Sequence, residues 1–348
     1  MNFTKILTHW YSVNKRNLPW RETKNPYQIW LSEIIMQQTQ IKQGLPYYDA
    51  FVNKFPTIFK LANANEQDIL KLWQGLGYYS RARNLHASAK YVVNELNGKF
   101  PTTYSELLKL KGVGDYTASA IASICFDEPT AVVDGNVYRV LSRHFGIDTP
   151  INSTLGIKEF KTLATTLIDT KNPGDYNQAI MEFGAVQCKP KNPNCINCPL
   201  KNSCVALQKD YVSELPVKLK KTKVTKKYFN FLVILSEGEK IIFEKRVSKG
   251  IWQNLYQFPL VESKKSLESH EFHYLNLKDT PIEKIPFEHS LYNETDKIHK
   301  LSHQHLYTKF WIISADILTE NTIPFTKIKT YPTPILISNF IDEFDFLF

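Results

Sequence analysis

Two carboxylate side chains, Glu33 and Asp134, have positions that suit proton transfer and the stabilisation of a positive charge. Glu33 interrupts an otherwise apolar helical run over 31–36, and Asp134 precedes an amphipathic helix predicted over 137–145. A carboxylate at a helix N-cap is expected to stay ionised, which suits a group that stabilises a nearby positive charge. In an arbitrary protein, a solvated helix face and simple capping would explain both residues, so their meaning depends on their context.

Four of the five cysteines lie within 17 residues, at Cys188, Cys195, Cys198 and Cys204. Zinc ribbons usually pair two CxxC knuckles that lie further apart, and this pattern has only one. Four thiolates in so tight a loop suit a compact [4Fe–4S] cluster with one cysteine on each iron, and structural zinc is the alternative. Cys125 stands alone in an apolar run and is expected to be a buried small hydrophobe.

The segment Gly112-Val113-Gly114 precedes a helix that is predicted to begin near Tyr116. Its two glycines let the backbone turn tightly and leave N–H groups exposed at a helix N-terminus, which is an anion site suited to a DNA phosphate. A single Gly-x-Gly is more often a plain turn, so this motif also needs support from its surroundings.

The elements that must position these residues divide the chain in two. Glycines and prolines punctuate residues 1–210 between short segments of helical periodicity, so an all-α module is predicted there, with the cysteine loop at 188–204. Residues 211–227 are rich in lysine and predict a basic linker. Runs of β-branched and aromatic residues follow, with a hairpin pattern over 228–244. Residues 228–348 therefore predict a smaller mixed α/β domain.

Charge is divided unevenly along the 348 residues. The net charge is +9, of which residues 1–210 carry +7 and the linker carries +5, whereas residues 228–348 carry −3. A basic balance favours a polyanionic partner, and its division assigns nucleic-acid binding to the first module and the linker. No apolar stretch could span a membrane and no export signal is visible, so we expect a cytoplasmic, nucleoid-associated monomer that binds no membrane.

The segment 33–40, Glu-x-x-x-Gln-Gln-Thr-Gln, closely resembles a motif of the adenine DNA glycosylase family (MutY type). The resemblance extends through 18–21, 75–82, 177–179 and the cysteine loop, and so covers the first module. Leu107–Ile124 resembles the helix–hairpin–helix of the wider endonuclease III superfamily, with a lysine in place of its usual proline. The resemblance implies a helix–hairpin–helix glycosylase core whose [4Fe–4S] cluster orders a basic loop.

The resemblance also implies the catalytic roles. Glu33 would protonate N7 of an adenine flipped out of the duplex and would later activate water. Asp134 would stabilise the oxocarbenium ion or trap it covalently, which is the two-carboxylate logic of glycosidases. Tyr116 and Asn136 would orient these carboxylates.

Contacts to the DNA follow from the same resemblance. Gln178 would read the adenine edge, while Gln38 and Tyr78 would occupy the gap around the opposing base. The other implied contacts are Trp20, Arg21, Gly112, Val113 and Gly114.

One position separates the branches of the superfamily. In the lyase branch, the second residue after Gly-Val-Gly is a lysine that attacks the sugar as a Schiff-base nucleophile, whereas here it is Tyr116. A tyrosine cannot form that imine, so the sequence predicts a monofunctional glycosylase.

The segment 250–259 resembles the Gly-Leu-Trp…Phe-Pro stretch of the family's Nudix-like domain. No glutamate-rich helix that could hold Mg²⁺ follows it, so the domain is predicted to read 8-oxoguanine opposite the adenine without catalysis. Leu301-Ser302-His303 resembles the family's Phe-Ser-His loop, in which the aromatic residue is here replaced by leucine. A polar strand edge is the alternative for these three residues, and His299 is expected at the surface.

The leading prediction is a glycosylase of base excision repair that removes adenine opposite 8-oxoguanine or guanine in duplex DNA. The nearest alternative is an endonuclease III-like glycosylase/lyase on oxidised pyrimidines, against which Tyr116 argues. A non-enzymatic iron–sulfur DNA-binding protein would give Glu33 and Asp134 only structural roles. A Nudix pyrophosphatase with a helical appendage is disfavoured because the Mg²⁺-binding helix is missing.

Overall fold

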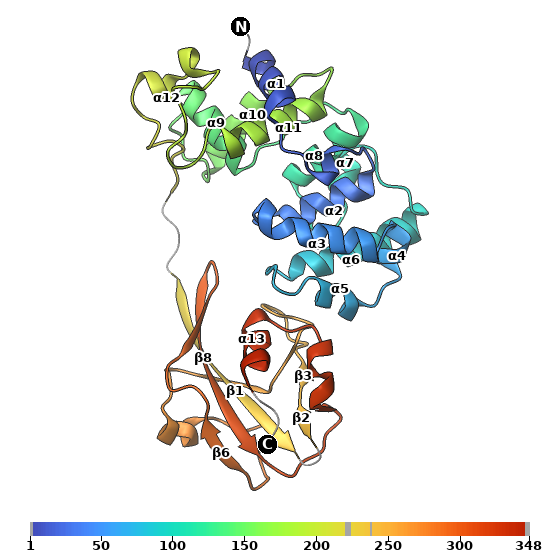
Figure 1. The fold of residues 1–348 in the computed structure, drawn as a ribbon, viewed down its shortest axis with the longest axis vertical. Helices are drawn as coiled ribbons and strands as arrows, with labels where there is room; N and C mark the ends of the chain where they lie inside the picture. Colours follow the sequence, from blue (N-terminus) through green and yellow to red (C-terminus); the bar gives the residue numbers. More distant parts are fainter. Residues whose placement is uncertain (1–2, 220–223, 237–238, 345–348) are drawn as a thin grey trace. The chain divides into compact units, whose positions relative to one another are not determined.

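The computed structural model describes residues 3–219, 224–236 and 239–344 (Figure 1). Residues 220–223 of the predicted linker therefore lie outside the described residues. Within 211–219, the backbone oxygen of Leu215 accepts a hydrogen bond of 3.0 Å from Nε of Arg143, so this part of the predicted linker is held by the helical module. The first strand already begins at Thr225.

The chain divides into two compact units, each built from two separate stretches of sequence. Unit 1 comprises Met1–Asn63 and Asn84–Lys220, and unit 2 comprises Ala64–Arg83 and Lys221–Phe348. The predicted fold class, an all-α core followed by a strand-rich α/β domain, is confirmed. The predicted boundaries differ from these units because Ala64–Arg83, although helical, groups with the strands.

The described part of unit 1 is helical, as its periodicity predicts. Its helices are α1 (Phe3–Asn14), α2 (Pro26–Met36), α3 (Ile41–Lys54), α4 (Ile58–Ala62), α6 (Ser80–Leu96), α7 (Tyr104–Leu107), α8 (Asp115–Phe126), α9 (Gly135–Phe145), α10 (Thr154–Leu167), α11 (Pro173–Val186) and α12 (Val205–Gln208), with the short 3₁₀ helices η1 (Pro19–Arg21) and η2 (Lys201–Ser203). Among the described residues, no helix is long and apolar enough to cross a membrane.

Helix α11 packs against α1, α8 and α9 within unit 1 (Figure 1). Two glycines permit this close packing. A Cβ on Gly174 would meet the backbone oxygen of Ser123 in α8 at 2.8 Å, and one on Gly184 would meet that of Asn136 in α9 at 2.8 Å. The second contact brings α11 directly against the N-terminus of α9, where Asp134 lies.

Unit 2 is built on a mixed sheet with the strand order β6-β8-β1-β2-β9, to which β5 adds on β1 and β7 on β8. The long strands β1 and β8 pair in parallel, and the strands beside them pair antiparallel. The strands are β1 (Thr225–Ser236), β2 (Lys240–Ile242), β5 (Leu260–Ser263), β6 (Glu288–Leu291), β7 (Lys297–Lys300), β8 (Gln304–Ser314) and β9 (Thr322–Pro324), with β3 (Glu244–Lys245) and β4 (Tyr256–Gln257) in a second sheet. The remaining elements are α5 (Glu66–Leu72), α13 (Ile335–Glu343) and the 3₁₀ helices η3 (Ser269–Tyr274) and η4 (Phe325–Thr330).

Both faces of the central strand pair are covered. On one face, Trp311 packs on Phe272 of η3 with ring centroids 5.0 Å apart. On the other face, Phe310 stacks on Phe340 of α13 at 4.1 Å. Burial on both sides explains why β1 and β8 read as nearly continuous apolar runs in the sequence. The hairpin predicted over 228–244 is confirmed as β1 and β2, with Glu237 and Gly238 of its turn outside the described residues.

Hydrogen bonds attach Ala64–Arg83 to the rest of unit 2. Nζ of Lys71 donates to the backbone oxygen of Tyr331 at 3.2 Å, and Nε2 of Gln74 donates to Oγ of Ser338 at 2.9 Å. Three further bonds join Tyr79 to Thr333, Arg83 to Gln253 and Asn254 to Glu66. Each of these hydrogen bonds depends on one polar side chain, and such side chains do not change the helical periodicity of the segment. The sequence therefore assigns the segment to the helical module.

Candidate active site

Two adjoining cavities of about 840 and 650 Å³ gather the predicted catalytic residues of unit 1. Both are lined by Glu33 from α2, Tyr116 from α8, and Asp134 and Asn136 at the start of α9. Of the predicted DNA contacts, Gln38, Gly112 and Gly114 line the larger cavity, and Trp20 and Arg21 line the smaller. Residues that lie far apart in the sequence therefore meet in one place.

Glu33 is held inside the protein by its helix, between the buried residues Ser32 and Ile34. Its side chain keeps partial solvent exposure because it faces the cavity, yet the surrounding protein removes most of its hydration. Burial raises the pKa of Glu33 to about 7, the charge of Asp134 adds to the rise, and a hydrogen bond from Tyr116 opposes it. A carboxyl group that keeps its proton near neutral pH can act as a general acid.

Asp134 is the N-cap of α9, as the sequence predicts. Its Oδ1 accepts the backbone N–H groups of Asn136 and Val137 at 2.9 and 2.8 Å, and its Oδ2 accepts Nδ2 of Asn136 at 2.8 Å. Burial raises the pKa of Asp134 above its ordinary value, and these three hydrogen bonds act against the rise. The ionised form is thus far better supported at Asp134 than at Glu33, which has a single donor.

Tyr116 stands beside both carboxylates. Burial first, and then the charges of Glu33 and Asp134, hold the pKa of Tyr116 well above its ordinary value. Its hydroxyl therefore stays protonated and lies 3.1 Å from Sδ of Met181. Such a hydroxyl can donate a hydrogen bond to Glu33, and it cannot form an imine.

Arg139 ties the end of this site to the cysteine loop. Its Nη2 donates to Oδ1 of Asn136 at 2.9 Å and to the backbone oxygen of Gly184 at 2.5 Å. Its Nε donates to the backbone oxygen of Cys188 at 2.7 Å. The orientation of the Asn136 amide, which donates to Asp134, is therefore fixed by a buried guanidinium that the sequence does not single out.

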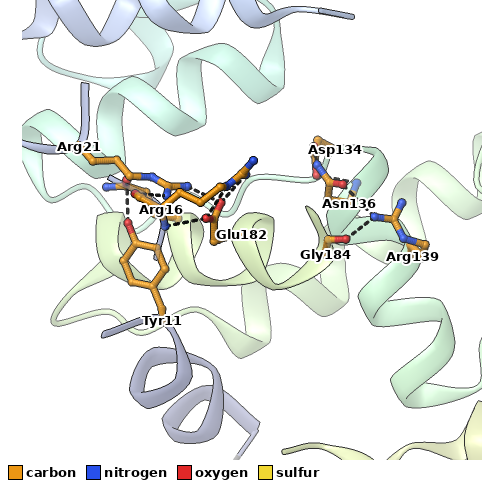
Figure 2. A network of polar contacts seen from close by, with 9 residues as sticks. Tyr11, Arg16, Arg21, Asp134, Asn136, Arg139, Glu182 and Gly184 are labelled. Carbon is orange, nitrogen blue, oxygen red and sulfur yellow. Dashed lines mark hydrogen bonds and ion pairs between the residues drawn. The ribbon is translucent and has the colours of Figure 1, made fainter. Parts of the chain in front are cut away.

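A second polar network surrounds Glu182 (Figure 2). Glu182 lies on α11, the helix that also carries Gly184. Arg16 donates to Glu182 through its backbone N–H and through Nε and Nη2, and Arg21 donates through Nη2 at 2.7 Å. Burial raises the pKa of Glu182, but the hydrogen bonds from the two arginines outweigh it and lower the pKa to about 2. Arg16 and Glu182 line the smaller catalytic cavity, and no sequence motif points to either of them.

Gln178 is not brought together with the catalytic residues. It lines a separate cavity of about 290 Å³, and its Oε1 accepts a hydrogen bond of 3.1 Å from the Tyr11 hydroxyl. Arg21 lines this cavity as well as the smaller catalytic one. Arg21 is therefore shared by the cavity of Gln178 and the cavity of Glu33.

The predicted helix–hairpin–helix has the local geometry that its glycines suggest. Gly112 has a φ of +79°, and a Cβ there would meet Cβ of Asn84 at 2.9 Å, so glycine is required on two grounds. Val113 is buried, and α8 begins directly after Gly114 without a side-chain cap. The turn thus presents its backbone to the larger cavity.

The four cysteines Cys188, Cys195, Cys198 and Cys204 line one cavity between α9 and the cysteine loop, together with apolar side chains such as Leu200. Among the described residues, no group of three or more His, Cys, Asp or Glu side chains lies close enough together to hold a single metal ion. Four thiol groups that line one cavity are the donor set that an iron–sulfur cluster requires.

Arginines of α9 support this arrangement. Nη1 of Arg143 lies 3.5 Å from Sγ of Cys188 and 2.7 Å from the backbone oxygen of Lys189, so a fixed positive charge stands beside one of the four sulfurs. Burial raises the pKa of the Cys198 thiol to about 11, so a thiolate there would need a cationic group as a partner.

In unit 2, a cavity of about 540 Å³ brings Tyr78 together with Leu301, Ser302 and His303. These last three residues form the tip of the β7–β8 hairpin, where the Leu301 N–H donates to the Gln304 backbone oxygen at 2.8 Å. They therefore form a turn that leads into β8.

Two further side chains, which the sequence does not assign to a site, line this cavity. Trp252 and His299 pack with ring centroids 5.8 Å apart. His299 is half-buried, and burial lowers its pKa, so the expectation of a surface histidine is wrong. The 250–259 motif contains the tryptophan and could have indicated it, whereas nothing in the spacing of His299 points to the cavity.

The backbone of Tyr78 has a strained conformation, and a neighbouring side chain lies over the Tyr78 ring. It has a φ of +47° and lies next to Gly77, whose φ is +71°. The Arg81 guanidinium lies 5.7 Å from the Tyr78 ring and 5.1 Å from the Trp73 ring, so it is placed between the two. Positive φ in a tyrosine costs free energy, and such strain is retained where surrounding contacts determine it.

Comparisons with known proteins agree with this description. Residues 31–161 match the family described as HhH-GPD superfamily base excision DNA repair protein, and residues 230–343 match the NUDIX domain. Adenine DNA glycosylases of two strains of Buchnera aphidicola are 39% identical over 75% of this chain and 76% of theirs, and 37% identical over 89% and 86%. The human adenine DNA glycosylase is 45% identical over 60% of this chain and 40% of its own.

Solved structures resemble the helical part. A thermostable thymine-DNA glycosylase, 30% identical, superposes with a TM-score of 0.55 over 60% of this chain and 95% of its own. An endonuclease III in a non-covalent complex with DNA, 22% identical, shares the fold with a TM-score of 0.52 over 60% and 94%.

Proposed function

Because the chain belongs to the adenine DNA glycosylases of base excision repair, we propose that its substrate is duplex DNA in which adenine lies opposite 8-oxoguanine or guanine. The observation that carries the proposal is the pairing of Glu33, whose pKa is raised to about 7, with the hydrogen-bonded Asp134 in one cavity beside the helix–hairpin–helix. The sharing of the helical fold with an endonuclease III that binds DNA supports a duplex as the partner.

Glu33 begins the reaction as the acid. An adenine flipped into the cavity presents N7 to the protonated carboxyl, and the transferred proton makes the base a better leaving group. The resulting carboxylate then takes a proton from the attacking water. Tyr116 is hydrogen-bonded to Glu33 and so helps to hold its carboxyl group in place.

Asp134 stabilises the sugar as the bond breaks. The oxocarbenium ion carries positive charge, and a carboxylate with three hydrogen-bond donors is ready to face it without reorganisation. Asn136 orients the carboxylate through Oδ2, and Arg139 in turn orients Asn136. Since no lysine stands at position 116, hydrolysis ends with an abasic site and an intact strand.

We assign a [4Fe–4S] cluster to the four cysteines. When bound, the cluster would cross-link the 188–204 loop and keep its lysines in place for a DNA backbone, without taking part in the reaction. We also propose that the chain acts as a monomer.

The 540 Å³ cavity of unit 2 is the proposed site for the opposing base. Ser302 and His303 offer hydrogen-bonding groups at an exposed turn, and Tyr78 offers a half-exposed ring. Leu301 supplies an apolar wedge in place of an aromatic one.

A single-turnover assay tests the proposal as a whole. The purified full chain is incubated with duplexes carrying A:8-oxoguanine, A:G, A:T and thymine glycol pairs, and the strands are analysed with and without alkali. Strand breaks at the adenine that appear only after alkali are expected. Cleavage at thymine glycol without alkali, or no excision at all, would overturn the proposal.

A further inference from the structure

Glu182 is a buried carboxylate that the reaction described above does not use. Its side chain is 1% exposed, and it accepts hydrogen bonds from Arg16 and from Arg21 at 2.7 Å. Two guanidinium groups around one carboxylate leave the cluster with one net positive charge. Such a charge is costly to bury unless its geometry is fixed, and here it is fixed by bidentate pairing with Arg16.

The cluster of Arg16, Glu182 and Arg21 faces the proposed catalytic residues. Arg16, Arg21 and Glu182 line the same cavity as Glu33 and Asp134. Arg21 is held further by a hydrogen bond of 3.0 Å from its Nη1 to the backbone oxygen of Arg16, and its guanidinium lies 5.5 Å from the Tyr11 ring. Its side chain is only 10% exposed, so solvent screens it poorly.

We propose that Glu182 is a positioning residue that holds Arg21 and limits the positive charge facing Glu33, so that Glu33 keeps its proton at neutral pH. The inference deepens the proposed function and rests on it. A positive charge near a carboxyl favours its ionised form, so an unneutralised Arg21 would remove the proton that adenine needs. Glu182 halves this effect by compensating one of the two arginines.

Several further groups face Glu33 and are left in place by the test below. Tyr116 and Cys125 approach it from α8, and Asp134 approaches it from the start of α9. The remaining charged groups of the two cavities are Lys42, Asp115 and Arg139. Because these are constant among the variants, a change in the pH dependence reports the charge of the Arg16–Glu182–Arg21 cluster.

The test measures the single-turnover rate of adenine excision from an A:8-oxoguanine duplex across the pH range. Glu182→Gln raises the net charge of the cluster from one to two, and the alkaline limb of the profile should move down by on the order of one pH unit. At a pH above both limbs, the rate should fall about tenfold. Arg21→Gln removes a charge, and its limb should move in the opposite direction.

Two controls separate charge from structure. Glu182→Asp keeps the charge and should leave the limb near that of the wild type, even if the rate is lower. Glu95→Gln removes an exposed carboxylate of α6 in the same unit and should change nothing. Thermal unfolding of each variant identifies those that fold, and if Glu182→Gln does not, Arg21→Gln and Glu182→Asp decide.

The outcomes distinguish a failure of the proposed function from a failure of the inference about Glu182. If the wild type excises no adenine or shows no alkaline limb, the proposed function itself fails. If the wild type shows the limb, while Glu182→Gln lowers the rate equally at every pH, Glu182 is a structural residue only and the inference is overturned. A limb that moves up in Glu182→Gln would overturn it as well.

Discussion

Arg139 donates a hydrogen bond of 2.7 Å from Nε to the backbone oxygen of Cys188. The same guanidinium donates to Asn136, which donates to the catalytic candidate Asp134. The first cysteine of the loop and the carboxylate that we propose to face the sugar are therefore separated by only two side chains. A shift of the cysteine loop would therefore change the orientation of Asp134 through Arg139 and Asn136.

Arg139→Lys should lower the single-turnover excision rate, because an ammonium group cannot satisfy the four acceptors of the guanidinium, which are Oδ1 of Asn136 and the backbone oxygens of Gly135, Gly184 and Cys188. A loss of about 10–100-fold is expected, the size typical for residues that orient a functional group. Arg246→Lys is the matched control, since Arg246 donates to a backbone oxygen in unit 2, away from this network. A full excision rate in Arg139→Lys would contradict the linkage.

Glu33→Gln should abolish adenine excision while leaving duplex binding intact. The amide has the shape of the carboxyl group but cannot transfer a proton, and general acid catalysis contributes about 10²–10⁴-fold. The single-turnover rate and the affinity for an uncleaved duplex are measured in parallel. Excision within a factor of a few of the wild type would rule out Glu33 as the acid.

The excision rate should depend on pH in a bell shape. On the alkaline side it should fall as the pH rises through about 7, because Glu33 loses its proton there. On the acidic side it should fall as Asp134 becomes protonated, at a higher pH than for a free aspartate because burial raises its pKa. A rate that stays constant through the neutral range would show that excision does not require a proton on Glu33.

The carboxyl group of Glu33 should also affect the free energy of unfolding and its dependence on pH. The pKa of Glu33 rises from 4.5 to about 7 on folding, so the folded state binds more protons than the unfolded state between these values. The free energy of unfolding contributed by Glu33 is therefore present in full below pH 4.5 and is lost as the pH rises to about 7. Denaturant unfolding of the wild type and Glu33→Gln should differ in this window, and parallel curves would refute the assignment.

Tyr116→Lys should convert the protein into one that forms a covalent link with DNA. A lysine placed among the buried surroundings of Tyr116 would have a lowered pKa and could attack the sugar as an amine. Borohydride should trap the resulting imine as a protein–DNA adduct on gels. Tyr116→Phe, which keeps the ring, should give no adduct, and equal trapping in both variants would count against the geometry.

Ser302→Ala combined with His303→Ala should reduce the preference for A:8-oxoguanine over A:G by about tenfold, the value of one or two lost hydrogen bonds. The A:G rate should change little, because the turn lies in unit 2 and the catalytic residues lie in unit 1. Ser290→Ala, an exposed serine of β6, serves as the control. An unchanged ratio of the two rates would place lesion reading elsewhere.

Local interactions explain which features can be predicted from the sequence. Asp134 is predicted correctly as an N-cap because capping depends on the residues that follow it within one turn. The turn at Gly112 is predictable for the same reason, since a positive φ requires glycine there whatever surrounds it. The helical module and the β1–β2 hairpin follow from periodicity alone.

Long-range contacts account for the features that no local pattern records. Glu182 lies on an apolar helix, and only the three-dimensional approach of Arg16 and Arg21 turns it into a charge cluster. Gln178 belongs to a motif shared with the family, yet its side chain is bound to Tyr11 outside the catalytic cavities. A motif identifies a residue, whereas the neighbours that determine its orientation come from distant parts of the chain.

The composition of unit 2 has a consequence for how the protein is made. Ala64–Arg83 leaves the ribosome long before most of the residues to which it is hydrogen-bonded, since Tyr331, Thr333 and Ser338 lie near the end of the chain. At about 5–20 residues per second, more than ten seconds separate the two during synthesis. Throughout that interval the segment that carries Tyr78 lacks its hydrogen-bond partners Thr333 and Ser338, so a nascent chain could complete its catalytic cavities before it completes the cavity of about 540 Å³ in unit 2.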